Sequence, residues 1–271
     1  MIKRIGYYLD VFKEYMRVSF LAAVEYRAGL WGWLLANPIQ FVVGFAPIKF
    51  VVEEFGDVAG WNYGELAFLY GLAAISHGLN VIFFIQSWFM GWDVVDGEFD
   101  RLMLRPLNVL FQFYFTGLNP VGISDMIPAI CVFVYGCIKV GFVWNLANTL
   151  CVLSMLIAAT FIRCSVYLIL GSMSFWTKSH NNFSDYTQQL IDKATMYPLS
   201  IYPESFQFIL TYIIPVAWIS FYPVSRLLGK SLGRLNGSVA IWGTPIVAVI
   251  LFVIAASVFN RGLKHYESAG N

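Results

Sequence analysis

Six apolar segments limit the folds open to this chain more than any other feature, because each has about the length of a helix that crosses a bilayer. They cover residues 29–52, 66–90, 121–141, 146–174, 206–223 and 239–259. A helix needs about 20 mostly apolar residues to cross the hydrocarbon core. Hydrophobic residues make up 59% of the chain, whereas a soluble domain carries about 45–50%. The sequence therefore predicts an all-α integral membrane protein with six transmembrane helices.

The segment before the first span predicts an amphipathic helix over residues 3–27. Ile5, Leu9, Phe12, Met16, Phe20 and Ala23 recur at helical spacing, and charged residues fill the faces between them. Such a helix usually lies flat on the membrane surface; a plain cytoplasmic extension of the first span is the alternative. We therefore divide the chain into an amphipathic interfacial helix (residues 1–28), a transmembrane domain (29–260) and a cytoplasmic tail (261–271).

The distribution of basic residues predicts that both termini lie in the cytoplasm. Six spans place the two termini on one side, and the segments on that side then hold most of the Lys and Arg residues. Loop 224–238 is the exception, because it carries three basic and no acidic residues on the predicted outer side. A short helix that folds back toward the interface would explain this loop, and so would a miscounted span.

A charged island, residues 93–108, separates the second and third predicted spans. It holds four acidic residues and two arginines in a chain that is only 12% charged, so it must face water. A helix through residues 98–104 would stop near Arg105, because Pro106 cannot continue it. Leu102, Met103 and Leu104 could then enter a groove on another protein, with charge-assisted bonds from Asp100, Arg101 and Arg105 at its rim. The alternative is a loop whose arginines only fix the orientation of the chain.

The motifs of catalytic and metal sites are missing from the sequence. Gly229, Lys230 and Ser231 resemble the end of a nucleotide-binding P-loop, but the required earlier glycine is Val224. The three histidines and four cysteines show no metal-binding spacing. We therefore expect no catalytic residue, no metal and no cofactor in this chain. The net charge of +1 gives no reason to expect a nucleic-acid partner.

Arg163 is the ionisable residue that the sequence places deepest in a predicted span. Ionisable residues at membrane depth often mark a substrate or ion path, so Arg163 is a candidate pathway residue. An arginine paired within the bundle for structural reasons is the alternative. A single buried cation is too little for an ion-coupled carrier, which normally needs a relay of acids. The sequence therefore favours a transporter that takes its energy from elsewhere.

Three patches together resemble one family. They are residues 97–108 (GEFDRLMLRPLN), residues 197–203 (YPLSIYP) with the later 211–215 and 222–224, and residues 262–270 (GLKHYESAG). The pattern resembles the six-span permease subunits of bacterial ABC exporters of the type-2, ABCG-like class, in the branch of multidrug or daunorubicin-type export permeases. The first patch is the most specific of the three.

The resemblance implies a cytoplasmic coupling helix between spans two and three, a surface-lying connecting helix at the N-terminus, and short re-entrant helices between spans five and six. Residues of the island would dock a separate ABC ATPase, namely Asp96, Glu98, Asp100, Arg101, Leu104 and Arg105. ATP and Mg²⁺ would then bind the ATPase and not this chain. A second copy or a paralogous permease would complete a homodimer or heterodimer in the bacterial inner membrane, for multidrug efflux.

Two other functions stay open at this point. A self-contained secondary carrier or channel would need no partner, and a membrane scaffold would carry no flux. The substrate is not determined by the sequence.

Overall fold

A computed structural model describes residues 2–179, 182–230 and 237–267, and the regular elements in this part of the chain are all helices. The longer helices are α1 (Ile2–Glu25), α2 (Arg27–Phe55), α3 (Tyr63–Phe84), α7 (Ile123–Lys139), α8 (Leu146–Ser172), α10 (Asn182–Thr195) and α13 (Gly237–Leu263). The shorter ones are α4 (Gln86–Val95), α5 (Glu98–Met103), α6 (Val109–Thr116), α9 (Ser174–Thr177), α11 (Glu204–Phe208) and α12 (Phe221–Leu227), with the single turns η1 (Pro120–Gly122), η2 (Leu199–Ile201), η3 (Ile209–Ile213) and η4 (Val216–Trp218). The predicted all-α fold is confirmed for these residues.

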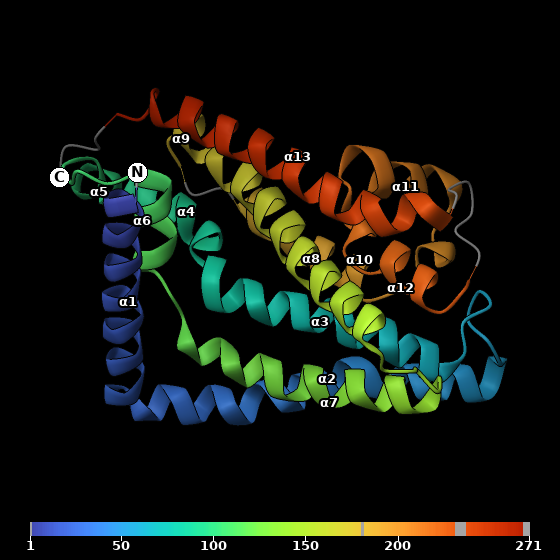
Figure 1. Ribbon diagram of the computed structural model, residues 1–271. Coiled ribbons are helices and arrows are strands. Elements are labelled where there is room, and N and C mark those ends of the chain that lie inside the picture. The colour runs from blue at the N-terminus through green and yellow to red at the C-terminus, as the bar shows by residue number, and fades with distance from the viewer. Residues whose placement is uncertain (1, 180–181, 231–236, 268–271) are drawn as a thin grey trace.

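Within residues 2–179, 182–230 and 237–267, five stretches are helical, long and apolar enough to cross a bilayer. They are Ala28–Glu54, Tyr63–Val95, Pro120–Lys139, Leu146–Thr177 and Trp242–Leu263, and each overlaps a predicted span. Their helices pack side by side in the order α2, α7, α3, α8 and α13, as Figure 1 shows. Five of the six predicted spans are therefore confirmed as helices of spanning length.

Two glycines allow the closest helix contact in the bundle, that of α3 with α7. A Cβ atom on Gly71 would lie 2.5 Å from Phe133 Cα, and one on Gly136 would lie 2.4 Å from the Phe68 backbone nitrogen. Small residues let helix backbones approach in membranes, where packing replaces the hydrophobic effect as the force between helices. The α3–α7 pair is thus the tightly packed part of the fold.

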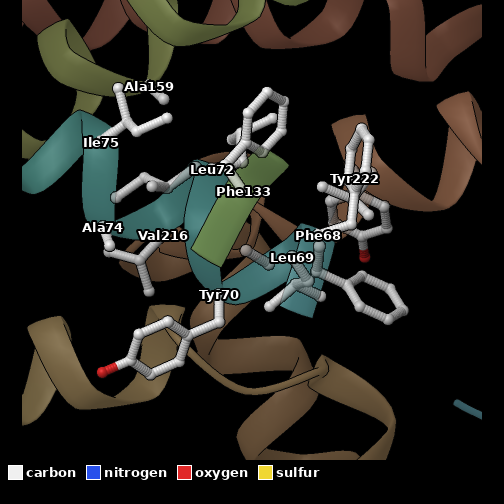
Figure 2. Packing of buried hydrophobic residues seen from close by; sticks show 14 of the residues in the cluster. Phe68, Leu69, Tyr70, Leu72, Ala74, Ile75, Phe133, Ala159, Val216 and Tyr222 are labelled. Carbon is white, nitrogen blue, oxygen red and sulfur yellow. The ribbon is translucent and has the colours of Figure 1, made fainter. Parts of the chain in front are cut away.

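The larger of two hydrophobic clusters lies around α3. Figure 2 shows part of it, with side chains of α3 close to residues of α7, α8 and the segment after α11: Phe68, Leu69, Leu72, Ile75, Phe133, Ala159, Val216 and Tyr222. Ten of the first twelve residues of α3 are buried, between Gly64 and Ala74. The central helix is therefore the one whose sequence is apolar all round, as expected of a helix buried in a bundle.

The two ends of the bundle can be told apart by their contacts. At one end α1 lies across the bundle and packs against α6, and α5 and the end of α13 also lie at this end (Figure 1). At the other end α3 begins with a capping box, in which the Asn62 side chain accepts from the Glu65 N–H at 3.0 Å. Lys230 pairs with Glu65 there at 2.6 Å. The loop at residue 230 and the loop before α3 thus share one end, as the predicted topology requires.

The predicted fifth span over residues 206–223 is wrong as a single straight helix. The stretch Glu204–Ile213 and the stretch Val216–Leu227 are bent by 80° relative to each other. Pro215 stands at the bend, where its ring and missing N–H prevent a continuous helix. These two pieces are a broken span or a re-entrant loop.

The polar segment after span four contains α10, which packs inside the bundle and was not predicted as a helix. Its residue Thr195 receives a hydrogen bond from Arg163 of α8, with 3.0 Å between Arg163 Nη2 and Thr195 Oγ1. Because this hydrogen bond joins Thr195 to Arg163 inside the bundle, part of α10 lies at the same depth as Arg163. The basic loop 224–238 is described only in part, since residues 231–236 lie outside the described residues.

Candidate functional site

The charged island folds into α5 and the turns on either side of it. Gly97 adopts φ +77° between α4 and α5, a conformation that favours glycine. The helix ends at Met103, slightly before the predicted end near Arg105. Asn108 then begins α6, because its side chain accepts a hydrogen bond from the Phe111 N–H at 3.0 Å. The island is therefore a short helix between two sharp turns.

Phe99 anchors α5 to the rest of the protein. Its side chain is fully buried, and four rings from four other segments surround it. The centroid distances are 5.4 Å to Phe113 of α6, 4.9 Å to Phe175 of α9, 6.0 Å to Phe259 of α13 and 5.8 Å to Tyr266. We call these five residues the Phe99 cluster. Because aromatic pairs at such distances add to the energy of burial, α5 cannot shift without moving α9 and α13.

The helical phase of α5 divides its side chains between the two sides. Phe99 and Leu102 point inward, with 0% and 5% of their surfaces exposed, whereas Leu104 is 87% exposed. The expectation that Leu102 enters a groove on a partner is therefore wrong, because this leucine is already buried against the bundle. Arg101 and Arg105 are exposed on the outer side, and Arg101 is paired with Glu98.

The N-terminal helix α1 contacts the same end of the bundle. The centroids of Tyr8 and Phe111 lie 4.8 Å apart, and those of Phe12 and Phe115 lie 4.9 Å apart. Arg105 Nη1 donates to the Tyr15 hydroxyl at 3.4 Å. The amphipathic pattern predicted this helix, but not that its aromatic residues would face α6.

The C-terminal residues complete this end. Glu267 pairs with Lys178, which holds the pKa of the Glu267 carboxyl below its usual range. Burial, with the Asp100 carboxylate nearby, raises the pKa of Tyr266 to about 12. The tail, α1, α5, α6 and α9 thus form one composite surface, which we call the end platform.

All six residues predicted to dock an ATPase lie in α5 or within two residues of its ends. Asp96 closes α4, with its backbone N–H donating to the Trp92 carbonyl at 2.8 Å. Glu98, Asp100, Arg101, Leu104 and Arg105 follow within α5 or directly after it. The structure therefore brings the predicted residues together, while their role in docking stays a prediction.

Arg163 lies apart from the end platform, in the interior of the bundle. Its side chain is fully buried and is ion-paired with Asp192 of α10. Its second Nη atom donates to Thr195 Oγ1 at 3.0 Å and lies 3.4 Å from Ser76 Oγ. His77 Nδ1 lies 3.3 Å from the same Asp192 oxygen that contacts Arg163. We call Ser76, His77, Arg163, Asp192 and Thr195 the Arg163 network.

Asp192 and His77 lie in the same network as Arg163, and neither was predicted from the sequence as its partner. The inward face of α10 consists of Gln188, Ile191, Asp192 and Thr195, all buried. These positions recur at i, i+3, i+4 and i+7, which is one face of a helix. That spacing could have indicated a packed helix. It went unnoticed because three of the four residues are polar.

The described residues contain no group of three or more His, Cys, Asp or Glu that could hold a metal ion. Lys230, the lysine of the P-loop-like tripeptide, contacts Glu65 and lies 5.1 Å from the centre of the Trp61 ring. It is thus engaged in joining two loops at the far end of the bundle.

Comparison with known families adds one decisive finding. A family described as "ABC-2 family transporter protein" matches residues 39–270, which is most of the chain. The chain belongs to the ABC-2 family. No curated protein and no solved structure gives a significant match.

The ABC-2 assignment confirms the expected class, a permease component of an ABC transporter. This ABC-2 protein is a multi-pass membrane protein, and its described residues contain five helices of spanning length, or six if the bent pair counts as one span. Membership implies a membrane subunit without an ATPase site of its own and an ATPase partner in an ABC system.

Proposed function

We propose that this ABC-2 protein is the membrane subunit of an exporter, driven by a separate ATPase that docks on α5. The docking residues are Asp96, Glu98, Asp100, Arg101, Leu104 and Arg105. ATP and Mg²⁺ bind the ATPase, and two permease copies, or this chain and a paralogue, form the substrate pathway across a bacterial inner membrane. Multidrug substrates of the daunorubicin type would fit the resemblance given above.

The observation that carries this proposal is the anchoring of a short polar helix in an aromatic cluster. A helix that receives force from a motor must be exposed on one side and tied to the moving helices on the other. Leu104 is 87% exposed while Phe99 is fully buried, and the Phe99 cluster joins α5 to α9 and α13. A loop that only fixed orientation would need its arginines but not this anchor.

The exposed side of α5 has the chemistry of a docking surface. Arg101 keeps 66% of its side chain exposed although it is paired with Glu98. Surface ion pairs are weak, so Arg101 can exchange Glu98 for a carboxylate on a partner at little cost. Leu104 beside it supplies the apolar contact that would enter a groove.

The experiment that tests the proposal is co-expression of the tagged permease with each ABC ATPase that a neighbouring gene is found to encode. We expect wild-type protein to retain the ATPase through purification, and Arg101→Glu to lose it. Lys49→Glu is the matched control, because Lys49 is also exposed and carries the same charge but lies on α2 away from the platform. Equal ATPase recovery with both variants would contradict docking at α5.

One observation favours the alternative of an ion-coupled carrier. The sequence offered a single buried cation, but the structure adds Asp192 and His77 beside it, and such relays occur in proton-coupled transporters. The purified permease, reconstituted alone in liposomes with a pH gradient and no nucleotide, separates the two functions. A sustained proton-coupled flux under these conditions would support the carrier.

A further inference from the structure

The helix α10 is held in the bundle mainly by polar contacts. Three of the four inward residues, Gln188, Asp192 and Thr195, are polar, and among the α10 residues whose side chains the structure describes Ile191 is the one buried apolar residue. The neighbouring helix α3 presents the opposite case, since its buried residues are mostly apolar. When apolar helix faces separate in the presence of water, their exposure to water is unfavourable. When polar faces separate, each group can replace its lost hydrogen bond with one to water. Of these helices, α10 is thus the one that a water-filled route could release most easily.

The contacts of α10 converge on one carboxylate. Asp192 Oδ1 is within reach of both Arg163 of α8 and His77 of α3. Thr195 adds a second attachment, because its Oγ1 accepts from Arg163 Nη2 at 3.0 Å and its carbonyl accepts from the Ser220 hydroxyl. A single side chain therefore links α10 to two different helices of the bundle.

The network is not fully satisfied in the packing observed. Among the described residues, Arg163 Nε and Gln188 Oε1 are buried without a hydrogen-bond partner. Buried polar groups are normally paired, and a partly paired network is less favourable than a complete one. The observed packing therefore leaves two polar atoms that another arrangement of α10 could pair.

We infer that the Arg163 network is a latch for α10, in which Asp192 is the positioning residue. With the latch closed, Asp192 lies between Arg163 and His77 and holds α10 against α8 and α3. With the latch open, α10 leaves this site and its polar face meets water. The use of this motion in transport rests on the proposed function, but the latch itself does not.

Hydrogen–deuterium exchange of the permease alone, in lipid nanodiscs, tests the latch. We expect Asp192→Asn to speed exchange in residues 182–195 by at least about tenfold, because removing one partner of a buried pair is strongly destabilising. Exchange in α3 and α7 should stay unchanged. Lys193→Gln is the matched control, since it removes a charge from the adjacent but exposed position, and it should behave as wild type.

Two results would overturn the inference. One is unchanged exchange in residues 182–195 of Asp192→Asn. The other is faster exchange throughout α3, α7 and α8, which would make Asp192 a support of the whole bundle and not a latch of one helix.

A double variant guards against simple misfolding. Arg163→Met with Asp192→Leu leaves no unpaired buried charge, so it should fold and hold α10 by apolar contact. We expect its exchange in residues 182–195 to equal or fall below that of wild type. Exchange as fast as in Asp192→Asn would refute the latch. Because no ATPase is present, these outcomes are independent of whether α5 docks one.

Discussion

Replacement of Phe99 by alanine is the most informative perturbation of the end platform. The side chain is fully buried and contacts four rings. A buried Phe→Ala change typically costs about 3–5 kcal/mol, from lost transfer energy and the cavity that remains. A cost of 1 kcal/mol lowers the melting temperature of a domain of 150–250 residues by about 2–4 °C. We therefore expect Phe99→Ala to lower the melting temperature by about 6–20 °C.

The assay is thermal unfolding of the purified permease in detergent. Leu104→Ala serves as the matched control, since this residue of the same island is 87% exposed and should shift the melting temperature by less than about 2 °C. Phe99→Leu keeps most of the side-chain volume, so its melting temperature should lie between those of the two variants. Exchange measurements should locate the loss to α5 and residues 261–267.

An equal and small shift for Phe99→Ala and Leu104→Ala would refute the reasoning. It would mean that the Phe99 cluster contributes little to the stability of the fold, and that α5 is only loosely attached to the bundle. Loss of protection in α3 and α7 would also count against it, because those helices belong to the other hydrophobic cluster.

Two further predictions follow from particular contacts. Gly136→Ala should destabilise the permease by about 1–3 kcal/mol, because the added Cβ atom would lie 2.4 Å from the Phe68 backbone nitrogen. Gly32→Ala is the control and should be neutral in the same melting assay, because no atom lies within 4 Å of a Cβ atom added there. Lys178 holds the pKa of Glu267 below its usual value, so the contact should persist above the unfolded pKa and weaken as pH falls through the lower folded pKa. Exchange in residues 261–267 should then rise on acidification in wild type relative to Lys178→Gln, and parallel curves for the two proteins would exclude this contact as the cause.

The apolar helices of the bundle could be predicted from the sequence because their signal is local. Each has a long run of hydrophobic residues, and the charged island stands out between two such runs for the same reason. The end of α5 followed from Pro106, which cannot continue a helix. The inward direction of Leu102 did not follow, because the phase of a six-residue helix is set by Phe99 and the rings around it.

The helix α10 was not predicted because the groups that stabilise it in the bundle lie far from it in the sequence. Asp192 and Thr195 are tolerated at depth only through Arg163, which lies about 30 positions earlier in the chain. A hydropathy argument sees polar residues and predicts a loop. The same argument sees the apolar residues on both sides of Pro215 and predicts one span where the structure has an 80° bend.

The central claim is that a separate ATPase contacts this ABC-2 protein at α5. Photo-crosslinking with benzoyl-phenylalanine tests this contact. The test position is Leu104, which is 87% exposed on the end platform. The control position is Ile138, which is 73% exposed at the far end of α7. We expect a covalent adduct with the co-expressed ATPase from position 104 and none from position 138. An ATPase that co-purifies but crosslinks equally from both positions, or only from position 138, would contradict it.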